Sequence, residues 1–353
     1  MSIALILLFY KILLLSKINI NIRVLVLTIW MVFPRDIFAS AMITNDYLLV
    51  FNTTLTIYFI LIHFNSKLES KRWWFSFLCV TFFACLGGLI KQSGFVLLSL
   101  PFLICSRNIF LLESIKHKLV LITSILFGFL LSFSIELRNI IKYDNFLISN
   151  QDFFNYAADQ LPKKFEAIEF YNLKIISLLN HPFLSEYTLY SFNTEIFARF
   201  WYDYERRFVQ ESTISLITAR YAYSIGLFWI IFLGILLFRT NLLTIRLSPF
   251  SFHRYISLST ILFILFLSYY FVPFLQTLRF PHFSSMKAQF VLPAIPALLL
   301  LLSKLINGIK INTNIIFFIV FCNSIFLLLV LFSSYLGITH GINEMSGPLW
   351  IIP

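Results

Sequence analysis

The sequence is poor in charged residues. Only 12% of its 353 residues are Asp, Glu, Lys or Arg, whereas soluble domains carry about 25%. Hydrophobic residues make up 59% of the chain, and the mean hydropathy is +0.86. This composition excludes a soluble globular enzyme. It predicts an all-α polytopic membrane protein.

Cysteine and the common catalytic motifs are also scarce. The four cysteines lie inside apolar runs, and no C-x-x-C pair occurs, so packed thiols are expected rather than disulfides or a metal site. The sequence has no G-x-x-x-x-G-K-[ST], G-x-S-x-G or H-E-x-x-H motif, which leaves nucleotide hydrolysis and peptidase chemistry without support. The histidines His181, His282 and His340 lack ligand spacing. We therefore expect no cofactor, with a divalent metal as the alternative.

Long apolar runs predict about ten transmembrane helices. We place them near 2–16, 24–34, 47–64, 73–90, 94–112, 119–141, 220–238, 256–276, 289–303 and 313–336. The chain then divides into membrane helices over 1–142, a loop domain over 143–219 and further membrane helices over 220–353.

The basic residues predict the orientation. Thirteen of them fall in alternate short connectors, namely Lys17, Arg23, Lys67, Lys71, Arg72, Arg107, Lys116, Lys118, Arg239, Arg246, Arg254, Lys304 and Lys310. The other short connectors hold only Arg35, Lys91, Arg279 and Lys287. The positive-inside rule places the richer set in the cytoplasm and the loop domain on the outer face. The net charge of +11 is thus a topology signal, and no nucleic-acid partner is expected.

This orientation leaves the N-terminus outside. One more span before Met1 would reverse that, so we expect the chain to be a truncated or mis-started version of a longer protein.

Asp46 and Lys91 are two charges on the outer face that topology does not explain. Asp46, or Asn45 before it, can cap the helix that begins there, or Asp46 can face a cavity as a functional carboxylate. Lys91 can snorkel at a hairpin tip or form an anion site for a phosphate. Gly87, Gly88 and Gly94 around it predict close backbone approach and a sharp reversal.

Further charges follow on the same face. Arg138 and Lys142 can complement a helix dipole or extend the anion site. Arg199 and Asp203 lie in an aromatic stretch that suits either membrane anchoring or sugar stacking. The stretch also predicts a surface helix on the bilayer, with the apolar positions Ile196, Phe197, Phe200 and Trp201.

Four motifs in order resemble the GT-C glycosyltransferases. They read "SAMITNDYLLVFNTTLTIYF", "LGGLIKQSGFVLL", "LRNIIKYDN" and "KAQFVLPAIPALLLLL", over about residues 24–305. The chain is similar to the bacterial group of dolichyl-phosphate-mannose protein mannosyltransferases and the lipid A aminoarabinose transferase. The resemblance implies transfer of a sugar from a polyprenyl-phosphate donor to a lipid, glycan or protein acceptor. It also implies a multi-pass protein of the bacterial inner membrane with its active face outside.

The resemblance assigns roles by position. Asp46, beside Asn45, matches an acidic residue near the active cavity, and Lys91 matches a lysine near the donor phosphate. Arg138 and Asn139 match an Arg-Asn pair that leads into the outer loop. Lys287 precedes the position where the family usually has Arg-Tyr. We count all of these residues, together with Arg199 and Asp203, as donor-binding or supporting.

Two departures from the family pattern stand out. Gln289 and Phe290 replace the usual Arg-Tyr pair, and the first outer loop with its catalytic Asp is absent. Asp46 is therefore expected to act as a supporting carboxylate in a single inverting displacement. A lipid-glycan flippase or transporter and an inactive remnant of a transferase are the alternative readings.

Overall fold

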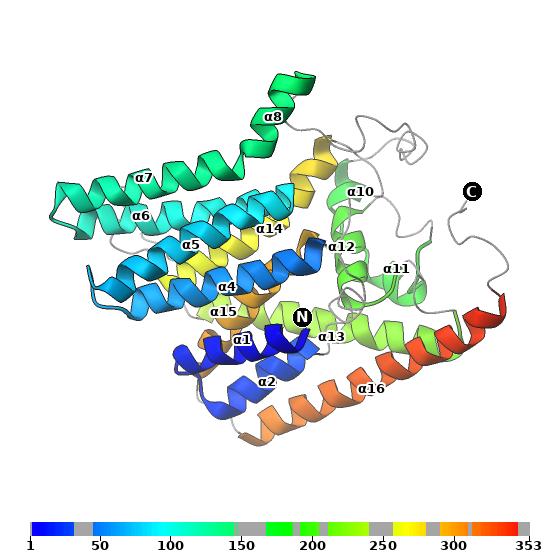
Figure 1. Ribbon diagram of the computed structural model, residues 1–353. Coiled ribbons are helices and arrows are strands. Elements are labelled where there is room, and N and C mark those ends of the chain that lie inside the picture. The colour runs from blue at the N-terminus through cyan, green and yellow to red at the C-terminus, as the bar shows by residue number, and fades with distance from the viewer. Residues whose placement is uncertain are drawn as a thin grey trace.

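The computed structural model describes residues 2–31, 45–144, 146, 167–185, 191–204, 211–239, 257–279, 290–309 and 313–344. Every regular element in these ranges is a helix, and no strand occurs in them (Figure 1). The expectation of an all-α protein is confirmed to this extent.

The helices follow the apolar runs of the sequence. The first five elements are α1 (Ser2–Leu15), α2 (Ile20–Met31), α4 (Asn45–Asn65), α5 (Lys71–Ile90) and the 3-10 helix η1 (Gln92–Leu98). The next six are α6 (Ser99–Leu111), α7 (Ile115–Ser132), α8 (Ser134–Tyr143), α10 (Ala167–Tyr171), α11 (Ile175–Asn180) and α12 (Phe192–Trp201). The last five are α13 (Thr213–Arg239), α14 (Leu258–Arg279), the 3-10 helix η6 (Leu292–Ala294), α15 (Ile295–Asn307) and α16 (Thr313–Glu344).

Six helical segments in the described ranges are long and apolar enough to cross a membrane. They are Asn45–Asn65, Lys71–Ile90, Gln92–Leu111, Ile115–Ser132, Thr213–Leu236 and Leu258–Leu275. The shorter apolar helices Ser2–Leu15, Ile20–Met31, Leu292–Asn307 and Asn314–Val330 coincide with the remaining predicted spans. The chain is thus a membrane-embedded helical protein, and the count of ten spans stays a prediction.

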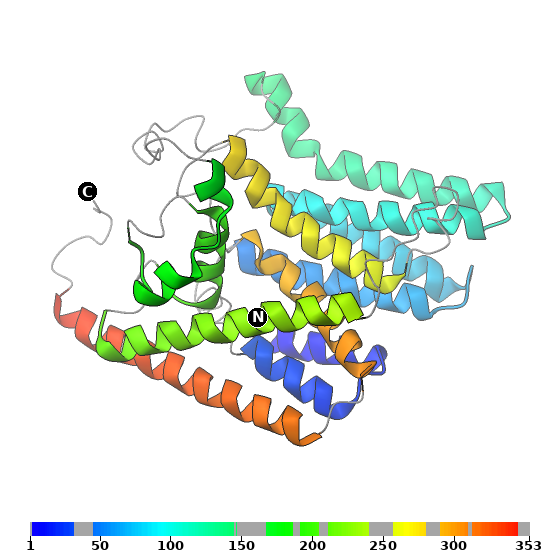
Figure 2. The same ribbon diagram turned by 180° about the vertical axis from the view of Figure 1, so that it is seen from behind.

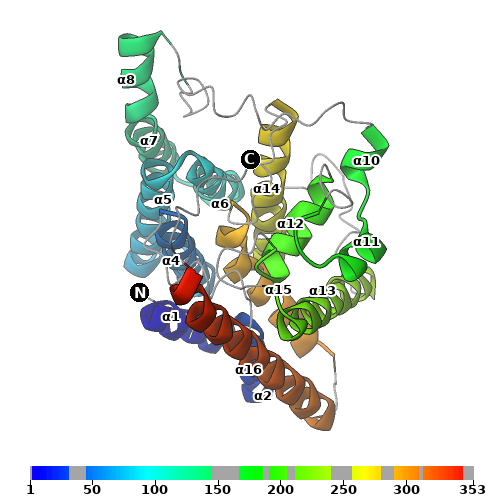
Figure 3. The same cartoon turned by 90° about the vertical axis from the view of Figure 1, so that its right-hand side faces the viewer.

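Helix α4 lies in the middle of the bundle. It packs against α1, α5 and α15 (Figures 1 and 3). In its most apolar stretch of 18 residues, 67% of the residues are buried inside the protein. The hydroxyls of Thr53, Thr54 and Thr56 donate to the carbonyls four residues earlier, at 2.8, 2.8 and 2.9 Å. No water is available in a bilayer core, so these bonds satisfy the threonine hydroxyls of a helix that lies at the centre.

The segment predicted as one span over 119–141 forms two helices instead. Helix α7 ends at Ser132, and α8 turns away from its axis at the edge of the bundle (Figure 1). The reason lies in the composition of α8, where Glu136, Arg138, Asn139 and Lys142 fall within ten residues. Such side chains are costly in hydrocarbon, so the apolar span stops before them.

Helices α10, α11 and α12 gather beside α13 and α14 (Figure 2). The prediction that the apolar positions of α12 face the bilayer surface is wrong. Ile196, Phe197 and Trp201 are at most 6% exposed, because α12 packs between α10 and α13. The division into three domains is untested and stays a prediction.

Candidate functional site

The start of α4 and the end of α5 lie side by side, because the two helices run antiparallel and a short turn joins their other ends (Figure 1). Asp46 is in the first turn of α4, and Lys91 directly follows α5. The Lys91 ammonium donates to Oδ1 of Asp46 and forms an ion pair with it. The side chains are only 25% and 11% exposed. Two charges that sequence reasoning treated separately are therefore one interacting pair.

Phe290 completes the surroundings of the Lys91 ammonium. Its ring centroid lies 4.6 Å from Nζ, within the range of a cation–π interaction. Phe290 is one of the two positions where the sequence departs from the transferase pattern. The structure brings it to the same lysine, while Gln289 and Lys287 lie outside the described residues.

Glycines make the reversal at Lys91 possible, as the sequence predicts. Lys91 is extended, with φ −163° and ψ 146°, and separates α5 from η1. A Cβ added to Gly94 would lie 1.9 Å from the carbonyl oxygen of Gly87, and one added to Gly88 would lie 2.0 Å from Oγ of Ser132. Only glycine permits this approach, so these glycines fix where the Lys91 side chain begins.

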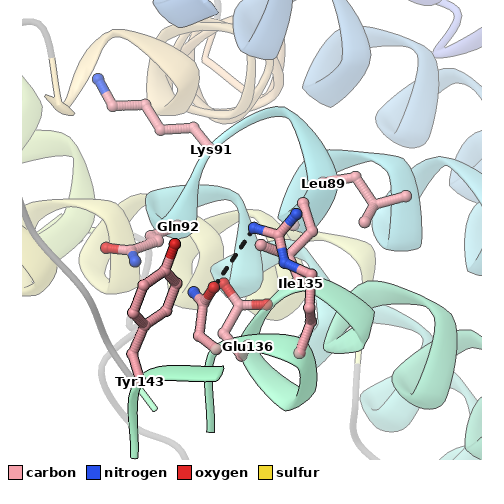
Figure 4. Close-up of a pocket in the computed structure, with 9 residues that line it drawn as sticks. Leu89, Lys91, Gln92, Ile135, Glu136 and Tyr143 are labelled. Atoms are coloured by element: carbon pink, nitrogen blue, oxygen red, sulfur yellow. Dashed lines mark hydrogen bonds between the residues drawn. The ribbon is translucent and has the colours of Figure 1, made fainter. Parts of the chain in front are cut away.

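A pocket of about 380 Å³ opens next to the ion pair, between the end of α5 and α8 (Figure 4). It is lined by Gly88, Leu89, Lys91, Gln92, Ile135, Glu136, Arg138, Asn139 and Tyr143. The Arg138 guanidinium donates to Oδ1 of Asn139 at 3.4 Å, the dashed line in Figure 4. Lys91 contributes its aliphatic stem to this pocket, while its ammonium points away from Glu136 (Figure 4). Three of the predicted site residues, Lys91, Arg138 and Asn139, thus meet at one place.

Helix α8 buries two of its polar side chains and exposes several apolar ones. Glu136 and Asn139, one turn apart, are 4% and 7% exposed. Leu137, Ile140 and Ile141 are 43%, 41% and 88% exposed. A helix that buries Glu136 and Asn139 and exposes these apolar side chains is suited to contact with lipid on the outside and a polar pocket on the inside.

Glu136 is a buried charged residue of the pocket that sequence reasoning missed. Its Oε2 atom is buried and has no hydrogen-bond partner among the described residues. The available signal was its spacing from Asn139, three positions on, which places both on one helix face. That signal was hidden because the segment was interpreted as the end of an apolar span.

Other predicted residues lie elsewhere. Asn45 is exposed at the first position of α4 and does not line the pocket. Arg199 is 2% exposed on α12 and forms an ion pair with Glu195 at 3.0 Å, and Asp203 is 1% exposed just beyond that helix. Neither Arg199 nor Asp203 lines the pocket, so their assignment to donor binding gains no support from its geometry.

The described residues contain no group of three or more His, Cys, Asp or Glu side chains that could hold a metal ion. Cys85 and Cys105 are buried, and Cys79 and Cys322 are half-buried thiols.

No protein-family model, curated protein or solved structure matches the chain.

Proposed function

We propose that the chain is a membrane glycosyltransferase that moves a sugar from a polyprenyl-phosphate donor to a lipid, glycan or protein acceptor. The proposed site lies on the outer face of a bacterial cytoplasmic membrane. The observation that carries the proposal is the Asp46–Lys91 ion pair at the edge of a pocket that also holds Arg138 and Asn139. The resemblance of the four sequence motifs to GT-C transferases supports it, because three of those motifs supply these residues.

The cations have a role in such a reaction. A polyprenyl phosphate that leaves the sugar gains negative charge, and a positioned ammonium or guanidinium offsets that charge. The donor phosphate would compete with Asp46 for the Lys91 ammonium. The donor phosphodiester carries one negative charge, as a carboxylate does, whereas the polyprenyl phosphate that leaves is a monoester with a charge of about −2. The Lys91 ammonium therefore interacts more strongly with the phosphate as its bond to the sugar breaks.

The carboxylates serve the acceptor. The acceptor oxygen attacks the anomeric carbon, the bond from that carbon to the phosphate oxygen breaks, and the phosphate leaves with the electron pair. A carboxylate accepts the proton of the acceptor hydroxyl. Asp46 is suited to position the acceptor or the donor as a second carboxylate, once the phosphate has drawn Lys91 away from it.

Binding of a short-chain polyprenyl phosphate without a sugar tests the proposal. The purified chain is placed in nanodiscs, and the affinity is compared with that of the Lys91→Gln variant. We expect a loss of about tenfold, the size typical of a charge-assisted contact. The Arg72→Gln variant, with its exposed change at the other end of α5, is the matched control. The double variant Asp46→Asn/Lys91→Gln removes the ion pair without leaving a lone charge and should bind as weakly as Lys91→Gln.

Equal affinity of the wild type and both Lys91 variants would refute the phosphate role. Turnover then separates the remaining readings. Incubation with sugar-loaded donors should release polyprenyl phosphate if the chain is a transferase. Movement of intact donor across a vesicle membrane, without release, would instead identify a flippase, and binding with neither outcome would identify an inactive remnant.

A further inference from the structure

A buried carboxylate oxygen without a partner is unusual. Desolvation of a charged group is costly unless a counter-charge or a hydrogen-bond donor compensates for it. Oε2 of Glu136 is buried, the residue is 4% exposed, and no donor reaches this atom in the part of the chain that the structure describes. The carboxylate lines a pocket with room for a small group. The missing partner is therefore best sought in a ligand that brings a donor.

The pocket also offers a cation at its rim. Arg138 is exposed and lines the same pocket, and its guanidinium donates a hydrogen bond to the amide oxygen of Asn139. The nearby ammonium of Lys91 is engaged with Asp46. The pocket thus presents one buried carboxylate and one accessible guanidinium, which suits a ligand with a cationic end and an anionic end.

The apolar face of α8 indicates where such a ligand comes from. Leu137, Ile140 and Ile141 are exposed on α8, the helix that lines one side of the pocket. The preceding helix α7 exposes Leu126, Phe127 and Leu130 by 59%, 63% and 64%. In a membrane protein these surfaces contact acyl chains. A molecule whose tails cover them brings its headgroup to the pocket between α5 and α8.

We infer that this pocket binds the headgroup of an aminophospholipid, with the ammonium on Glu136 and the phosphate on Arg138. A primary ammonium supplies the hydrogen that Oε2 lacks, whereas a choline group has no N–H to donate. An anionic headgroup without an amine meets the carboxylate and is disfavoured. This inference concerns the same pocket as the proposed function, but it goes beyond glycosyl transfer and does not depend on it.

Competition among lipids tests the inference. The purified full chain is reconstituted with equal amounts of phosphatidylethanolamine, phosphatidylcholine and phosphatidylglycerol, re-extracted in mild detergent, and analysed for lipids that remain bound. We expect phosphatidylethanolamine to be enriched about tenfold over the other two, the ratio typical of one charge-assisted contact. Equal retention of the three lipids, or enrichment of phosphatidylglycerol, would overturn the inference. This wild-type measurement stands even if a variant fails to fold.

Two variants locate the contacts. Glu136→Gln keeps the shape of the side chain and should reduce phosphatidylethanolamine to the level of phosphatidylcholine, while Arg138→Gln should reduce all three lipids. Glu69→Gln and Arg72→Gln, exposed at the other end of the α4–α5 hairpin, are the matched controls. Unchanged selectivity in Glu136→Gln would mean that the carboxylate does not bind the ammonium.

Soluble glycerophosphoethanolamine provides the last arm, because it has the same headgroup without acyl chains. We expect the lipid to stay bound in its presence. Displacement of the lipid would show that the pocket binds a free phosphodiester, and would refute the inference that its ligand is a membrane lipid.

Discussion

Lys91 and Asp46 are 45 positions apart in the sequence, yet their side chains form the ion pair that joins the end of α5 to the start of α4. The ring of Phe290, from a third segment, lies over the same ammonium. The pair therefore ties together three parts of the chain at the edge of the pocket.

Removal of one partner of this pair should destabilise the protein more than removal of both. Lys91→Gln and Asp46→Asn each leave a lone charge in a partly dehydrated site, with an expected loss of about 1–2 kcal/mol after allowance for solvent screening. The double variant should recover much of that loss. Unfolding in mixed micelles measures the free energies of unfolding of the wild type, the two single variants and the double variant. Glu69→Gln, in the exposed pair with His117, is the control. Additive losses would show that the two side chains do not interact.

Gly94→Ala should disrupt the reversal after α5. The new methyl group would lie 1.9 Å from a backbone oxygen and 2.3 Å from a backbone carbon of Gly87, and neither can move without shifting a helix. We expect the free energy of unfolding to fall by about 3 kcal/mol, which is typical of severe overpacking. Gly234→Ala is the control, since nothing lies within 4 Å of its added Cβ, and it should gain about 0.5–1 kcal/mol from helix propensity. Similar stabilities for the two variants would contradict the close packing.

Asn108→Ala should destabilise the other end of the α4–α5 hairpin. Nδ1 of His63 lies 3.1 Å from the carbonyl oxygen of Trp73, so it carries the proton, and Nε2 accepts from the Asn108 amide at 3.0 Å. Both side chains are at most 1% exposed. Loss of the amide leaves Nε2 without its donor, at a cost of about 1–3 kcal/mol. Asn65→Ala, which removes an exposed contact of 3.4 Å, should cost much less, and equal costs would argue against this bond.

Arg199→Met should be among the most damaging single changes in α12. Glu195 is completely buried and its side chain is 3.0 Å from the guanidinium. Without that cation the carboxylate is left in the core, and the expected loss is about 3–5 kcal/mol. Glu195→Gln added to Arg199→Met should recover a large part of it, since Tyr204 can still donate to Oε1. Lys174→Met, in the half-exposed pair with Glu169, should stay within about 1 kcal/mol of the wild type.

Thiol labelling at the two ends of α4 tests the proposed orientation. Asn45→Cys at the start of α4 and Lys67→Cys two residues after its end place exposed cysteines at opposite ends of this helix. A reagent that cannot cross the membrane should label intact cells at position 45 and not at position 67. The native cysteines are buried or half-buried, and the unmodified chain measures their background. Labelling at position 67 alone would show that α4 crosses the membrane in the opposite direction.

Much of the fold could be predicted because hydrocarbon imposes simple rules. Apolar runs of membrane-spanning length must be helical, and the observed helices coincide with those runs. The glycines around Lys91 also gave a correct prediction, since small residues beside an interhelical charge indicate a tight reversal. These signals are local and require no knowledge of the other helices.

The site was harder because its geometry depends on contacts between distant segments. Nothing near Asp46 indicates that Lys91 would be its partner. The break at Phe133 was missed because the hydropathy of α7 was extended into α8, which also concealed Glu136 on the buried face. Arg199 illustrates the opposite case, since arginine in an aromatic loop suggests a surface, whereas its pairing with Glu195 keeps it in the core.

The Asp46–Lys91 pair also constrains how the chain is assembled. Both charges lie at the same end of the α4–α5 hairpin, so they can meet only after both helices have crossed the bilayer in opposite directions. A chain in which α5 failed to cross would leave Lys91 and Asp46 on opposite sides of the hydrocarbon, each without its counter-charge. The ion pair therefore stabilises only the arrangement in which both helices of the hairpin are inserted.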